Sequence, residues 1–118
     1  MSDEELKYCR ALQPFFRERM GEWQVGDMYA MGNKILFVDE NNINKWWRSM
    51  NVLFIPRPID TENPERGLLG MIENLSFIYP LGSQWVVYIK PHEEVHFVAE
   101  TPALALLKAL AVQWGVTV

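Results

Sequence analysis

The stretch VHFVAETPALALLKALAVQWG, residues 95–115, decides the fold. It opens with Val95, Phe97 and Ala99 at every second position, and this period of two predicts a β-strand. A run rich in Ala and Leu follows at once, without the alternation. The stretch therefore predicts a strand that leads directly into an apolar helix.

The helix has clear start and stop signals. Thr101 is a suitable N-cap, Pro102 suits the first helical position, and the pattern runs to Trp114 before Gly115 ends it. Lys108 is the only charged residue between the cap and the stop. A helix this apolar and this short must pack against a sheet, another helix or a partner chain, because it is too short to span a bilayer.

The residues before the strand predict its hairpin partner. Residues 85–89, Trp-Val-Val-Tyr-Ile, are β-branched and aromatic, and residues 91–94, Pro-His-Glu-Glu, suit a loop between two strands. The sequence therefore predicts a strand, a loop and a second strand here.

This hairpin contains the spacing H-E-x-x-H, formed by His92, Glu93 and His96, which on a helix is typical of zinc hydrolases. The Cβ atoms of two histidines at this spacing lie about 5–6 Å apart on a helix and about 13 Å apart on an extended chain. We therefore expect no metal site. The alternative is a zinc-dependent hydrolase that uses His92, Glu93 and His96, with a third ligand from the downstream Glu100 or from a carboxylate that converges in space, such as Glu18, Glu22 or Asp27.

The rest of the chain reads as short elements with short links. Ser2 and Glu5 form a capping box for a helix over residues 3–20, kinked or restarted at Pro14. The remaining expected elements are strands at 28–30, 34–38 and 52–55, a helix over 64–72 weakened by Gly67 and Gly70, and a strand at 77–79. This order predicts one α+β domain over residues 1–118, with a mostly antiparallel sheet flanked by helices in an α/β sandwich.

Composition and charge narrow the functional classes. The 118 residues are 49% hydrophobic with a net charge of −4, and no basic stripe marks a nucleic-acid surface, so nucleic acid is an unlikely partner. We expect a cytoplasmic protein without a membrane span and without a cofactor, because there is no signal segment, no bilayer-length apolar run and no nucleotide-binding motif. Cys9 is the only cysteine and lies on the apolar face of the first helix, where we expect a core residue rather than a nucleophile.

Tryptophan usage suggests a contact surface. The chain has five Trp, more than one small core needs, and aromatic residues with Arg are enriched where proteins bind one another. In Lys45-Trp46-Trp47-Arg48 two aromatic residues are flanked by basic ones, and we favour a core or interface role for Trp46, Trp47 and Arg48 over base stacking. Trp114, at the end of the apolar helix, is the fourth interface candidate.

Residues 85–88, Trp-Val-Val-Tyr, and 98–110, Val-Ala-Glu-Thr-Pro-Ala-Leu-Ala-Leu-Leu-Lys-Ala-Leu, resemble the ending of the phage ABA-sandwich proteins, small domains encoded by phages and prophages. The motif at 63–68, Asn-Pro-Glu-Arg-Gly-Leu, is similar to short prophage proteins of unassigned role. The resemblance covers roughly residues 63–114. It implies helix, sheet and helix layers and an origin in a mobile element, and it offers no family active site to transfer.

The sequence therefore predicts a small phage or prophage accessory protein that is not an enzyme and acts by binding a partner protein or a second copy of itself. The zinc-dependent hydrolase is one alternative. A second is an acidic inhibitor of a host nucleic-acid-binding protein, for which this chain would supply its modest net charge of −4.

Overall fold

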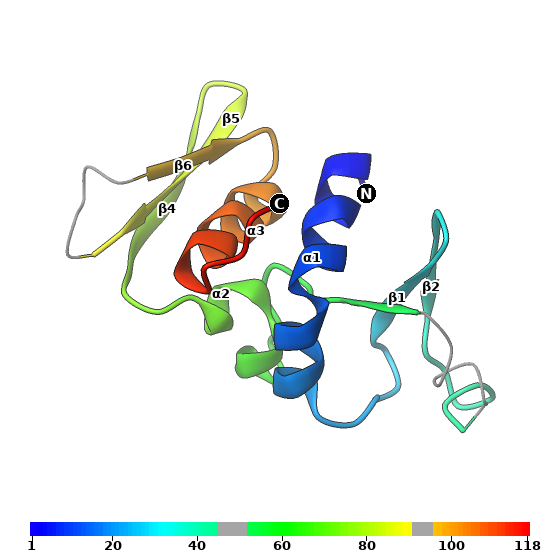
Figure 1. Ribbon diagram of the computed structural model, residues 1–118. Coiled ribbons are helices and arrows are strands. Elements are labelled where there is room, and N and C mark those ends of the chain that lie inside the picture. Colours follow the sequence, from blue (N-terminus) through cyan, green and yellow to red (C-terminus); the bar gives the residue numbers. More distant parts are fainter. Residues whose placement is uncertain (45–51, 91–95) are drawn as a thin grey trace.

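A computed structural model describes residues 1–44, 52–90 and 96–118 of the chain (Figure 1). The helices are α1 (Asp3–Met20), a 3₁₀ turn η2 (Pro64–Arg66), α2 (Leu68–Met71) and α3 (Pro102–Gln113), and the strands are β1 (Met28–Met31), β2 (Lys34–Phe37), β3 (Leu53–Ile55), β4 (Leu75–Leu81), β5 (Gln84–Ile89) and β6 (His96–Ala99).

The described strands form two separate antiparallel sheets, in the orders β2-β1-β3 and β4-β5-β6. Tight turns join β1 to β2 and β4 to β5. Gly32 and Gly82 both have φ of 63° in these turns, a conformation that costs glycine least. The predicted hairpin of residues 85–89 with the strand at His96 is confirmed, since Val87 pairs with Phe97.

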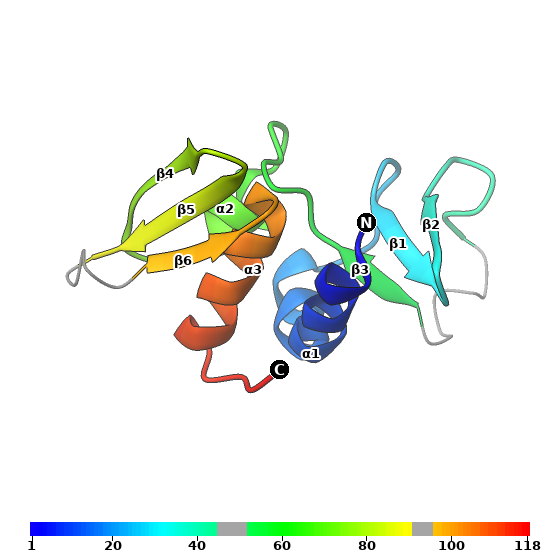
Figure 2. The ribbon, with the colours of Figure 1, turned by 90° about the horizontal axis from the view of Figure 1, so that it is seen from above.

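The helices lie between the two sheets. Figures 1 and 2 show the β4-β5-β6 sheet on one side, α3 and then α1 in the middle, and the β2-β1-β3 sheet on the other side. Helix α3 packs on β5 and β6, α1 packs on β3, and the two helices pack on each other. The α+β class and the antiparallel pairing are confirmed, but the layering differs from the expected order because the strands divide into two sheets that enclose the helices.

Helix α1 begins as predicted, with the Ser2 hydroxyl accepting a hydrogen bond from the Glu5 N–H at 3.2 Å. It continues through Pro14 without a break. The neighbouring Gln13 connects it to β3: its side-chain amide donates to the Phe54 carbonyl at 2.7 Å and accepts from the Phe54 N–H at 3.0 Å. One side chain thereby satisfies both backbone groups of a strand residue.

Helix α3 also has the predicted caps. The Thr101 hydroxyl accepts a hydrogen bond from Leu104 N–H at 3.1 Å and donates one to the buried Glu5 carboxylate at 3.1 Å. At the other end, the Gln113 amide accepts from the Glu73 N–H and donates to the Met71 carbonyl. Both ends of α3 are therefore tied to other segments.

The helix predicted over residues 64–72 is wrong in its continuity. Gly67 is extended, with φ of −90° and ψ of 156°, and separates η2 from α2. The break lets the chain fold against residues 57–60, because the N–H groups of Leu68 and Leu69 bond the carbonyls of Arg57 and Pro58.

One contiguous core joins the layers. It includes Leu12 and Phe16 of α1, Phe54 of β3 and Leu107 of α3, with Val87 of the other sheet. Among the helices of the described residues, none has the length and hydropathy that crossing a bilayer requires.

We expect Gly67→Ala to destabilise the fold by about 1–3 kcal/mol, because an added Cβ would lie 2.7 Å from the backbone nitrogen of Asp60 and force the chain apart. Urea unfolding followed by tryptophan fluorescence measures the loss. Gly32→Asn is the control, since nothing lies within 4 Å of a Cβ there and Asn tolerates positive φ. Equal stability of the two variants would contradict the close approach at Gly67.

Candidate functional site

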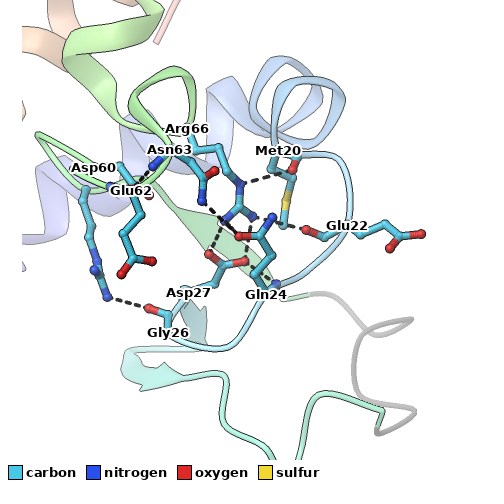
Figure 3. A network of polar contacts seen from close by, with 10 residues as sticks. Met20, Glu22, Gln24, Gly26, Asp27, Asp60, Glu62, Asn63 and Arg66 are labelled. Atoms are coloured by element: carbon cyan, nitrogen blue, oxygen red, sulfur yellow. Dashed lines mark hydrogen bonds and ion pairs between the residues drawn. The ribbon is translucent and has the colours of Figure 1, made fainter.

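The most buried polar cluster centres on Arg66, which is 4% exposed (Figure 3). Its guanidinium forms a two-point ion pair with Asp27, Nη1 to Oδ1 at 2.6 Å and Nη2 to Oδ2 at 2.7 Å. It also donates to the carbonyls of Met20 and Glu22 and to the side-chain oxygen of Gln24. All five N–H donors of the arginine therefore have an acceptor.

The local structure explains how these groups meet. Helix α1 ends at Met20, and its last carbonyls lack partners within the helix, so a cation placed there is favoured. Asp27 precedes β1, and its Oδ2 also accepts the Gln24 N–H at 2.8 Å, which closes the loop around the carboxylate. The 3₁₀ turn η2 brings Arg66 to the loop from the far side, with the guanidinium 5.4 Å from the centre of the Phe54 ring.

A polar cavity of about 220 Å³ adjoins this cluster. Its rim includes Arg57, which donates to the Gly26 carbonyl, and Asp60, whose carboxylate accepts the N–H groups of Glu62 and Asn63 (Figure 3). Arg66 and Asp27 line it too, but their charges satisfy each other. The cluster holds three segments of the chain together.

Cys9 lies in the core, as predicted. It is 1% exposed, and burial, reinforced by the negative charge of Glu5, raises the pKa of its thiol to about 12. A thiol that keeps its proton at neutral pH is a poor nucleophile.

The side of the β4-β5-β6 sheet that faces away from α3 has an unusual composition. Two rows of paired residues cross it, Phe77–Tyr88–His96 and Tyr79–Val86–Val98. Residues paired across strands and residues two apart on one strand share a face, so these six residues form one surface, which we call the outer aromatic face. It contains no Lys, Arg, Asp or Glu.

Burial supports this assignment of the two faces. Val87 and Ala99 belong to the core beneath the sheet, whereas Val86 is 2% exposed and yet lies outside that core. Val86 is therefore covered by its neighbours on the outer aromatic face. Figure 2 shows the helices on the opposite side of this sheet.

The rings of the outer aromatic face stack on one another. Phe77 lies 4.6 Å from Tyr88 and 5.7 Å from Tyr79, and Tyr88 lies 5.4 Å from His96, measured between ring centroids. A hydrogen bond to Tyr88 raises the pKa of the Tyr79 hydroxyl above its ordinary value. Phe77 is still 44% exposed, so solvent reaches the stacked rings.

Trp114, one of the interface candidates, is half-buried and packs on α1, and its role in an interface stays a prediction. Trp114 stacks on Phe15 at 4.9 Å with an 8° angle between the rings, and the Arg19 guanidinium lies 4.5 Å from its ring centre. This packing joins the end of α3 to α1. Trp46, Trp47 and Arg48 lie outside the described residues.

The proposed zinc ligands are only partly described. His96 is the first residue of β6, extended and exposed, with its ring beside Tyr88. His92 and Glu93 lie outside the described residues. Within residues 1–44, 52–90 and 96–118, no group of three His, Cys, Asp or Glu side chains is placed to hold a metal ion. The absence of a zinc site therefore stays a prediction.

Helix α3 leaves a small apolar hollow at its surface. The cavity, of about 160 Å³, lies between α3 and the sheet and is lined mainly by Ile89, Phe97, Ala109 and Val112. Val112 is 65% exposed beside it. The hollow has room for about one side chain.

The sequence analysis missed Arg66 and the outer aromatic face. Arg66 and Asp27 lie 39 positions apart, and no local pattern connects them. The signal for the face was present: in β5, Val86 and Tyr88 occupy the positions where a strand with a single buried face would carry polar residues.

No family model, curated protein sequence or solved structure matches this chain. The resemblance of residues 63–114 to phage proteins therefore stays a prediction.

We expect Arg66→Met to lower the free energy of unfolding by about 3–5 kcal/mol, because it leaves Asp27 buried and charged without its partner. Urea unfolding measures this loss in the free energy of unfolding. Adding Asp27→Leu to Arg66→Met should recover part of the loss, because the double variant buries no charge. Arg57→Met, at an exposed arginine that also donates to a carbonyl, is the control and should cost under about 1 kcal/mol. A loss at Arg66 as small as that at Arg57 would contradict the network.

The Cys9 pKa predicts how stability depends on pH. Between pH 9 and about 12 the folded protein retains the thiol proton, while the unfolded chain, with a pKa near 9.0, loses it. The contribution is complete below pH 9, and the free energy of unfolding then falls by up to about 1.4 kcal/mol per pH unit as pH rises. Cys9→Ala should show a smaller slope in urea unfolding measured from pH 8 to 10.5, since all other groups titrate in both proteins. Equal slopes would contradict this account.

Proposed function

We propose that the protein is a small, non-enzymatic accessory protein that binds another polypeptide through the outer aromatic face. The observation that carries the proposal is the composition of that face, two rows of aromatic and aliphatic side chains without a charge. An antiparallel sheet with one face in water normally has polar residues on that face. Exposed apolar surface of this kind marks sites of protein contact.

The side chains match what protein interfaces use. Tyr and Phe are enriched in interface cores, and charged residues are depleted there. Phe77, Tyr79 and Tyr88 are already held by mutual stacking, so binding costs little side-chain entropy. A rigid aromatic cluster is the kind of anchor that dominates binding energy.

The same features argue against nucleic acid. Binding to a single strand combines stacking with a positively charged groove, and this face offers no cation. The ring faces of Phe77 and Tyr88 are also partly occupied by each other. A polypeptide partner fits the face better.

Several expectations from the sequence stay predictions beside this proposal. They are the phage or prophage origin, the cytoplasmic location, a second contact surface at Trp46, Trp47 and Arg48, the zinc-dependent hydrolase with His92 and His96, and the acidic inhibitor of a host nucleic-acid-binding protein.

Photo-crosslinking tests the proposal. With p-benzoylphenylalanine in place of Tyr79, irradiation of cells that express the full chain should give a covalent adduct with a polypeptide. The control is the same replacement at Ile59, which is 62% exposed in a loop of the 57–72 segment and should give no adduct. Replacement at Trp47 tests the second predicted surface. No adduct at position 79, or the same adducts at 59 and 79, would contradict the proposal.

A further inference from the structure

We propose that the polypeptide on the outer aromatic face is a second copy of this chain, with two β4-β5-β6 sheets packed face to face about a two-fold axis. This inference rests on the proposed function and names its partner. It follows from the charge of the face, the arrangement of the sheet edges and the area that the face can bury.

The charge of the face favours a copy of itself. A partner selected by charge would meet complementary groups, and this face has none to offer. Two copies can meet through these six residues without opposing like charges. Each chain has a net charge of −4, but repulsion between the distant charges is weak at physiological salt, where screening acts over about 8 Å.

The edges of the sheet make face-to-face packing the available route. On the edge strand β4, Pro80 has no N–H to offer another strand. On the edge strand β6, the Lys108 ammonium from α3 donates to the Val98 carbonyl at 3.1 Å. Strand addition is hindered at both edges. Apolar antiparallel faces pack on each other at about 10 Å, which the stacked rings and Val98 can fill.

The area predicts the strength of the dimer. A whole aromatic side chain presents about 150–250 Å², and these rings are only partly exposed, so with Val98 and the adjacent Leu81 they offer at most roughly 400–500 Å² per copy. Two copies would bury about 800–1,000 Å², below the roughly 1,600 Å² of a standard interface. Leu81 is 61% exposed and extends the contact along β4. The expected dimer is weak and depends on concentration.

Sedimentation equilibrium of the purified full chain, from about 1 μM to 1 mM, tests this inference. We expect a monomer at the lowest concentrations and a dimer with a dissociation constant in the range of about 10–500 μM, as suits a contact of this size. Phe77→Asp would place like charges opposite each other and should weaken the dimer at least about 10-fold. Ile59→Asp, a change to the same residue at a 62% exposed position away from the sheet, should leave it unchanged.

Circular dichroism and urea unfolding establish that both variants remain folded. If Phe77→Asp does not fold, Leu81→Asp at the exposed end of β4 replaces it. A strict monomer at 1 mM, or a dimer insensitive to the charge on β4, would overturn the inference.

The crosslinked adduct at position 79 separates this inference from the proposed function. An adduct with twice the mass of the 13.8 kDa chain supports the second copy. An adduct of another mass leaves the proposed function in place and refutes the second copy. No adduct removes both.

Discussion

The buried guanidinium of Arg66 is the interaction on which the architecture depends. The position and orientation of the guanidinium are tightly fixed, because all five of its N–H donors are used and its partner Asp27 is buried with it. Through it, the end of α1, the loop before β1 and the turn before α2 are fixed against one another (Figure 3). That turn begins the chain's passage to the second sheet, so the network fixes the point from which this passage starts.

Polar side chains that substitute for backbone complete the assembly around this point. Gln13 pairs with both backbone groups of Phe54, and Gln113 pairs with the Met71 carbonyl and the Glu73 N–H. Each amide lets a helix adjoin a non-helical segment while the N–H and C=O groups that it meets keep hydrogen-bond partners. The apolar core supplies the driving force, and these directional contacts select one arrangement of layers from the many that the same core could fill.

Local sequence signals predicted the helices and strands well, but they could not predict contacts between segments far apart in the sequence. The Thr101 cap, the apolar helix after it and the hairpin of β5 and β6 could be predicted because period and capping depend on neighbours in sequence. The break at Gly67 could not, since it depends on how closely residues 57–60 approach. The division into two sheets, the Arg66 network and the outer aromatic face all require knowing which segments meet, and periodicity in one strand carries no such information.

The obstructed edges of the β4-β5-β6 sheet limit how large an assembly of this protein can become. A surface that pairs through its face is used up once two copies have met, whereas an open strand edge can recruit another molecule after every addition. Pro80 and the bond from Lys108 to Val98 obstruct that second route at β4 and β6. An apolar face on a sheet whose edges are obstructed in this way favours a closed pair over open-ended, fibre-like polymerisation.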